Sequence, residues 1–73
     1  MTDKQVHDKI KEISRKYING RPSINVEGLS SEFNVKRAVI IPHIDALKTL
    51  GYIEVYEAKD VLIITDKGKY ATL

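Results

Sequence analysis

The chain begins with apolar residues at the three- and four-residue spacing of one helix face. They are Val6, Ile10, Ile13 and Tyr17. Charged residues fill the opposite side, so the pattern predicts an amphipathic helix over residues 3–18. Thr2, with Gln5 three positions later, has the form of a capping box, and Asn19-Gly20 supplies a helix stop. Residues 21–23 then form a connector.

Two further helices are expected in the middle of the chain. Ile24 stands alone between turn residues, and Asn25 is a good N-cap for a second helix over residues 26–33. Asn34 suits the left-handed backbone at the end of such a helix. A third helix is predicted by four apolar residues at helical spacing, and Gly51 ends it as a C-cap. These apolar residues are Ile40, Ile44, Leu47 and Leu50.

After Gly51 the apolar period changes to two, which indicates strands. β-Branched and aromatic residues dominate residues 52–57 and 61–64, so we expect an antiparallel hairpin. Thr65 can cap a final turn of helix over residues 66–70. Alternation turns four apolar strand residues inward: Ile53, Val55, Leu62 and Ile64. Together, the elements predict a small α+β fold.

The composition limits what the chain can be. With 73 residues and no cysteine, it is expected to form a single domain over residues 1–73 without disulfides. No nucleophile, phosphate-loop or paired-carboxylate motif stands out, so neither enzymatic activity nor a cofactor is expected. His7 and His43, without cysteine, make a poor metal site. The N-terminus lacks a secretion-signal pattern, and no apolar stretch approaches the roughly 20 residues of a membrane span, so we expect a cytoplasmic protein.

The basic residues are concentrated in the first third of the chain. Twelve Lys and Arg against ten Asp and Glu give a net charge of +2, and six of these cations but only three of the acids precede Val26. Such a weak overall excess does not identify a polyanionic partner by itself.

Three segments carry a resemblance to a known family. Residues 29–35 read Leu-Ser-Ser-Glu-Phe-Asn-Val, residues 43–53 read His-Ile-Asp-Ala-Leu-Lys-Thr-Leu-Gly-Tyr-Ile, and residues 64–68 read Ile-Thr-Asp-Lys-Gly. In this order and spacing they resemble the winged helix-turn-helix superfamily over almost the entire chain. The resemblance implies three helices and a two- to three-stranded antiparallel sheet, in the order helix, strand, helix, helix, strand, strand. It also implies transcription regulation through double-stranded DNA, with the third helix toward the major groove.

The resemblance points to four DNA-contacting residues. Lys36 and Arg37 stand at the approach to the third helix, where their charges suit phosphates or guanine edges. His43, on the later exposed side of that helix, can donate to a phosphate, and Lys59 lies at the tip of the hairpin, or wing. The alternative for each cation is a solvated surface charge, and for His43 a surface residue resting against Leu47.

The third helix departs from the family pattern. Val39, Ile41 and Pro42 stand where many members place polar, base-reading residues, so direct readout of sequence would be limited. Pro42 has no N–H and disfavours a helical residue before it. We therefore expect the third helix to start at Pro42 or to kink there, and a start at Pro42 would leave Lys36 and Arg37 in the turn.

The hairpin favours a second function from a different class. Glu54, Glu57 and Asp60 surround Lys59, and carboxylates repel phosphates. The alternative function is therefore a winged helix that forms a homodimer or binds a protein partner without DNA. Its contacts would be the Ile41-Pro42 ridge or an outward hairpin face of Tyr52, Tyr56, Val61 and Ile63. The alternative for that face is coverage by the C-terminal turn, with Tyr70 and Leu73.

Overall fold

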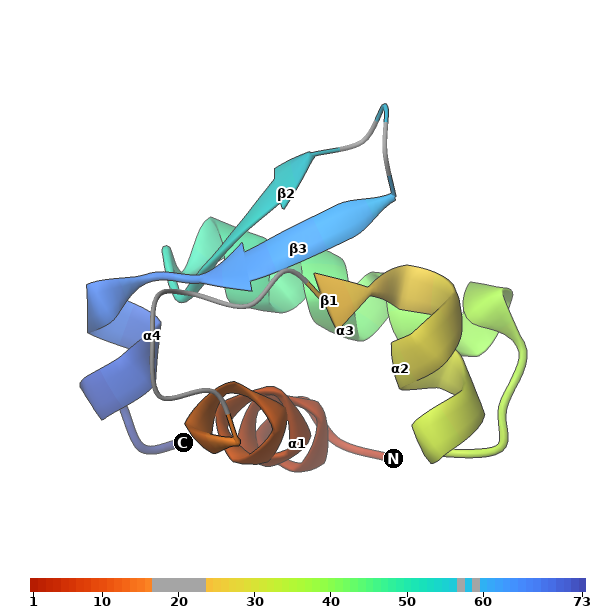
Figure 1. The fold of residues 1–73 in the computed structure, drawn as a ribbon, viewed down its shortest axis with the longest axis horizontal. Helices are drawn as coiled ribbons and strands as arrows, with labels where there is room; N and C mark the ends of the chain where they lie inside the picture. Colours follow the sequence, from red (N-terminus) through yellow and green to blue (C-terminus); the bar gives the residue numbers. More distant parts are fainter. Residues whose placement is uncertain (17–23, 57, 59) are drawn as a thin grey trace.

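The computed structural model describes residues 1–16, 24–56, 58 and 60–73. These residues form an α+β fold with four helices and one three-stranded antiparallel sheet (Figure 1). In chain order the elements are α1 (Asp3–Arg15), β1 (Ile24–Asn25), α2 (Val26–Glu32), α3 (Arg37–Thr49), β2 (Ile53–Tyr56), β3 (Val61–Ile64) and α4 (Asp66–Tyr70).

Helix α1 begins as the sequence predicts. The Thr2 side chain accepts from the backbone N–H of Gln5, and the Gln5 side chain accepts from the backbone N–H of Thr2, which completes the capping box. The helix ends at Arg15 with Lys16 as its C-cap, short of the expected end at residue 18. The Asn19-Gly20 stop and the connector over residues 21–23 lie outside the described residues.

The ends of α2 and α3 follow local signals. Asn25 Oδ1 accepts from the backbone N–H groups of Glu27 and Gly28, as expected of an N-cap. Asn34 has the left-handed backbone that its type allows, with φ of 53°. At the other end of α3, Leu50 is the C-cap and Gly51 follows with φ of 78°. The Tyr52 N–H then bonds to the Leu47 carbonyl, which completes a Schellman turn.

The sheet has the order β1-β3-β2, so the hairpin strand β3 lies in its centre. β2 pairs with β3 as the predicted hairpin, with Ile53 opposite Ile64. Ile24 does not stand alone, because it pairs with Leu62 in a two-residue strand. Of the four strand residues expected to face inward, Ile53, Leu62 and Ile64 are buried and Val55 is half-buried.

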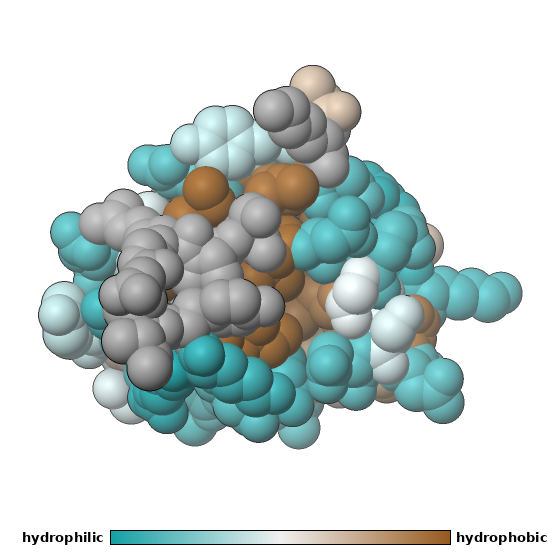
Figure 2. Space-filling model, viewed as in Figure 1, coloured by the Kyte–Doolittle hydropathy of each residue, from teal (hydrophilic) through white to brown (hydrophobic). Residues whose placement is uncertain are grey.

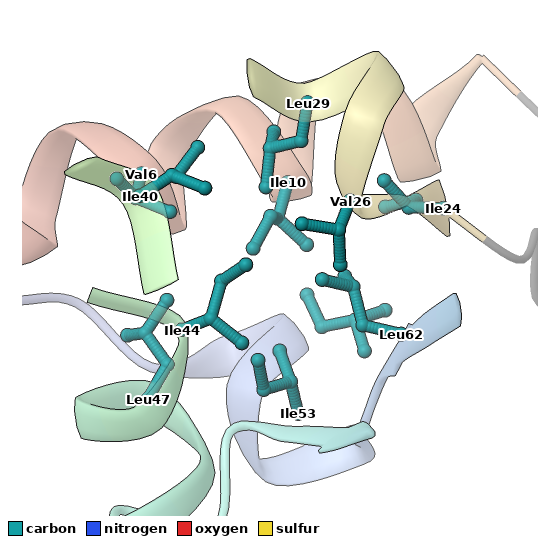
Figure 3. Close-up of a cluster of buried hydrophobic side chains, with 11 residues drawn as sticks. Val6, Ile10, Ile24, Val26, Leu29, Ile40, Ile44, Leu47, Ile53 and Leu62 are labelled. Atoms are coloured by element: carbon teal, nitrogen blue, oxygen red, sulfur yellow. The ribbon is translucent and has the colours of Figure 1, made fainter. Parts of the chain in front are cut away.

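One hydrophobic cluster joins α1, α2, α3 and the three strands. Figure 3 shows its side chains converging from these elements on a common centre. Burial of each such side chain is worth about 1.5–3 kcal/mol. The members are Val6, Ile10, Ile24, Val26, Leu29, Ile40, Ile44, Leu47, Ile53, Leu62 and Ile64.

The final turn of helix, α4, makes four helices where the family resemblance implies three. Thr65 Oγ1 caps it by accepting from the backbone N–H of Gly68, as the sequence predicts. Gly68 is buried, and a Cβ at this position would lie 2.0 Å from the Tyr52 carbonyl oxygen. The backbone of α4 therefore packs directly on the backbone that links α3 to β2.

Candidate functional site

The loop between α2 and α3 fixes where α3 begins. The Asn34 N–H bonds to the Ser31 carbonyl at 3.0 Å, and the Val35 N–H bonds to the Ser30 carbonyl at 3.1 Å. Lys36 follows as the N-cap of α3, but its side chain makes no capping hydrogen bond. The Lys36 side chain is exposed, and no carboxylate of the described residues pairs with it. Its ammonium group therefore remains available to a ligand.

Helix α3 runs through Pro42, so the expected start of the helix at that position is wrong. Arg37 lies in the first turn of the helix rather than in the preceding loop. Pro42 has no N–H for the carbonyl of Ala38, four residues earlier. Ala38 is exposed, so water can satisfy that carbonyl, while Ile40 and Ile44 hold both halves of the helix against the core.

The side of α3 opposite the core is uncovered along the whole helix. Its exposed residues follow a four-, three-, four-residue spacing, which keeps them in one line. They are Ala38, Pro42, Asp45 and Thr49. We call this line the outer face of α3. It is narrow and smooth, and its one charged side chain is a carboxylate.

Arg37 is held by carboxylates from two other elements. Its guanidinium Nη1 bonds to a carboxylate oxygen of Asp60, just before β3, and lies 3.4 Å from Glu27 Oε1 on α2. The hydrogen bond that Arg37 donates to Asp60 raises the pKa of Arg37, and Glu27 adds to the effect. One guanidinium faces two carboxylates, so this Arg37 cluster carries a net negative charge. The structure therefore does not present Arg37 as an open phosphate contact.

His43 does not lie on the exposed side of α3, which corrects the sequence prediction. Its Nδ1 is 2.6 Å from Asp3 Oδ1 at the start of α1, and the His43 side chain is 21% exposed. The ring thus joins α3 to α1. Lys59, the fourth candidate, lies outside the described residues. Of the four predicted DNA contacts, only Lys36 is described as exposed and without a carboxylate partner.

The proposed partner surfaces are smaller than the sequence suggests. Ile41 packs against the core, so the Ile41-Pro42 ridge reduces to the exposed Pro42. Tyr52 also packs against the core and does not belong to the outward hairpin face. Tyr56 is exposed, and Val61, opposite it, is half-buried. Near the middle of the view in Figure 2, apolar surface lies among hydrophilic residues.

The outward hairpin face also includes Ile63, and the C-terminal residues expected to cover the face leave it uncovered. Ile63 is half-buried opposite Glu54, a strongly exposed carboxylate on the same face. Tyr70 is 79% exposed, so it does not fold back over the hairpin as the alternative interpretation required. Leu73 is exposed as well. Apart from Glu54, the outward hairpin face therefore consists of a short strip of three residues: Tyr56, Val61 and Ile63.

Sequence reasoning missed the contact between α1 and α4. His7 is fully buried, and its Nε2 donates to the Gly68 carbonyl at 2.7 Å, since a carbonyl oxygen only accepts. The His7 ring stacks on Tyr52, with centroids 5.2 Å apart. Lys67 Nζ lies 5.8 Å from the centroid of that tyrosine ring. The available signal was helical phase, because His7 falls three residues before Ile10, beside the apolar face of α1.

In comparisons with known proteins, no family model, no curated protein and no solved structure matches the chain. Within residues 1–16, 24–56, 58 and 60–73, no three metal-ligating side chains come together. No helix in the described part of the chain has the length and apolar character needed to cross a membrane.

Proposed function

We propose that this chain is a winged-helix module that binds double-stranded DNA, mainly through phosphates. The element order from α1 to β3 and the three-stranded antiparallel sheet are compatible with the fold that the sequence resemblance implies, to which α4 is added. The loop at Asn34 joins two helices that both pack on the same core, as a helix-turn-helix unit requires.

The observation that carries the proposal is the uncovered outer face of α3. A major groove about 12 Å wide admits a helix, and the small side chains of Ala38 and Thr49 allow close approach. Lys36 stands at the N-terminal end of α3, two residues before Ala38, where it can pair with a phosphate. Pro42 offers no side-chain donor or acceptor to base edges, so the proposed binding depends little on base sequence.

The test is a titration of the protein against random-sequence duplex DNA at about 50 and 200 mM salt. Release of condensed counterions predicts a steep loss of affinity between these concentrations. Absence of binding at the lower salt concentration would refute the proposal.

A charge inserted on the outer face of α3 tests the orientation. Ala38→Glu puts a second carboxylate on this face and is expected to lower DNA affinity about tenfold. The fold should tolerate it, because an acid in the first turn favours a helix. Gln5→Glu is the matched control, since it adds the same charge on α1 and keeps the capping box. Equal losses of affinity in the two variants would argue against α3 as the groove-facing helix.

Association with itself or another protein is the second candidate. Val39 and Leu50 are 46% and 41% exposed and lie eleven residues apart, on one flank of α3. Tyr56 adds a third large exposed side chain, on the hairpin, next to the acid Glu54. Sedimentation equilibrium separates the candidates. Association would be favoured if the protein forms a dimer at micromolar concentration and does not bind duplex DNA.

A further inference from the structure

Basic residues gather where α1 ends beside α4. Figure 1 shows α4 and the marked C-terminus next to the end of α1. We call the resulting region the α1–α4 surface, and it combines residues more than 50 positions apart in the sequence. Its cations are Lys11, Arg15, Lys16, Lys67 and Lys69.

Hydrogen bonds fix α1 along this surface. His7 bonds to the Gly68 carbonyl, and one turn later Lys11 Nζ donates to the Ala71 carbonyl at 2.9 Å. Arg15 follows Lys11 by four residues, so it lies on the same side of α1, one turn further along. Arg15 is exposed, and so is Lys16, the C-cap, which lies around the end of α1 from the line of Lys11 and Arg15.

The α4 side of the surface is anchored by aromatic rings. Lys67 Nζ lies over Tyr52, which in turn stacks on the buried His7. Lys69 Nζ lies 5.8 Å from the ring centroid of Tyr70, which is largely exposed. The Lys67 and Lys69 side chains are both exposed, although the backbone between them is buried at Gly68.

The partners of these cations leave their charge uncompensated. Lys11 donates to a backbone carbonyl, and Lys67 and Lys69 lie over neutral rings, so no carboxylate of the described residues pairs with any of the three. By contrast, Lys4 pairs with Asp8, and Lys9 pairs with Glu12 and approaches Glu32. Asp66 is the one acid that α4 contributes, and on the α1 side Asp8, which lies three residues before Lys11, pairs with Lys4. The α1–α4 surface is therefore net positive.

We propose that the α1–α4 surface binds the phosphate backbone of double-stranded DNA. This inference rests on the proposed function and extends it, because it places phosphate contacts away from the start of α3. Duplex DNA carries one negative charge per about 1.7 Å of axis, so five cations on two adjoining helices can meet several phosphates. Four of the five are lysines, which act as point charges and read no base sequence.

The experiment compares two double variants in the duplex titration. Arg15→Gln/Lys69→Gln removes two exposed cations of the α1–α4 surface. The slope of log affinity against log salt is expected to fall by about two, at about 0.9 per lost phosphate contact, with affinity at 50 mM salt down on the order of tenfold. Lys16→Gln/Lys69→Gln serves as a second variant of the same surface, and thermal unfolding verifies that each variant folds.

The matched control is Lys4→Gln/Lys9→Gln, which lowers the net charge equally but removes cations already paired with carboxylates. Its slope is expected to equal that of the unmodified protein. Unchanged slopes in both surface variants, or equal slope losses in variants and control, would overturn the inference while leaving DNA binding intact. No duplex binding by the unmodified protein overturns the proposed function as well. Tighter binding of polyglutamate than of duplex DNA would reassign the surface to an acidic protein.

Discussion

The two ends of α3 carry opposite arrangements of charge. At its N-terminal end, Arg37 is outnumbered by the carboxylates of Glu27 and Asp60. At its C-terminal end, the Lys67 side chain lies near Gly51 and begins a region of cations that face carbonyls and rings. Only the C-terminal arrangement complements the α3 dipole, which favours cations at a helix C-terminus, because Arg37 opens the helix and its first turn holds no acid.

The difference shows that a cation's place in a motif does not establish its availability. Arg37 stands where the family resemblance expects a DNA contact, yet carboxylates of the same fold already occupy it. The α1–α4 surface matches no DNA contact expected from the resemblance, yet no carboxylate of the described residues pairs with its Lys11, Lys67 or Lys69. Three substitutions test this contrast, beginning with the one of largest expected effect.

The attachment of α4 should fail when Gly68 is enlarged. Gly68→Ala would drive a methyl group into the Tyr52 carbonyl, and overpacking of this kind costs about 3 kcal/mol of unfolding free energy. The matched control is Gly28→Ala at the other end of the molecule, where nothing lies within 4 Å of the added Cβ. That change should raise the unfolding free energy by about 0.5 kcal/mol, because alanine favours a helix over glycine.

Urea denaturation measures both glycine variants. Amide hydrogen exchange adds the location, since α4 should exchange faster in Gly68→Ala while α2 keeps its protection. Equal stability of the two variants would mean that α4 is not held against Tyr52 as described.

Replacement of the buried His7 should cost more unfolding free energy than replacement of the partly exposed His43. His7→Leu keeps a similar apolar volume but leaves the buried Gly68 carbonyl without its donor, at a cost of about 1.5 kcal/mol. His43→Leu removes a partly exposed contact with Asp3 and should cost less than about 0.5 kcal/mol. Urea unfolding of the two variants checks this order, and a larger loss for His43→Leu would contradict it.

Removal of the Asp60 charge should make Arg37 available to phosphates at the N-terminal end of α3, as Lys67 near its C-terminal end already is. Asp60→Asn keeps a residue that tolerates φ of 55° while releasing Arg37 from its closest carboxylate. DNA affinity at about 50 mM salt is expected to rise about threefold, with a salt dependence steeper by about 0.9. Glu54→Gln, an equal charge change at a carboxylate that bonds to the neutral Tyr56 hydroxyl, controls for net charge. An equal gain of DNA affinity in both variants would show that the gain comes from net charge and that Arg37 does not contact DNA.

Local signals in the sequence were sufficient for the start of α1, α2 and α4, for the end of α3 and for the hairpin. Thr2, Asn25 and Thr65 cap helices with their own side chains, so three or four neighbouring residues determine the outcome. Asn34 and Gly51 likewise depend on backbone preferences that belong to the residue type. The period-two pattern after Gly51 correctly predicted which strand residues are buried, apart from the half-buried Val55.

The site could not be predicted in the same way, because its decisive contacts are distant in sequence. Arg37 meets Asp60 23 residues later, and His43 meets Asp3 40 residues earlier. Only the packing of α3 against α1 and the hairpin brings these partners together. The continuity of α3 through Pro42 has a similar cause, since burial of Ile40 and Ile44 outweighs the loss of one hydrogen bond.

The contact at Gly68 also has an evolutionary consequence. A side chain at this position meets the main chain of residue 52, and no substitution at that residue moves a carbonyl oxygen away. A second mutation at residue 52 therefore cannot compensate for a larger residue at position 68. Descendants that preserve the docking of α4 must keep glycine at position 68. Thr65, three residues earlier, caps the same turn through the Gly68 N–H, so the docking of α4 constrains both positions.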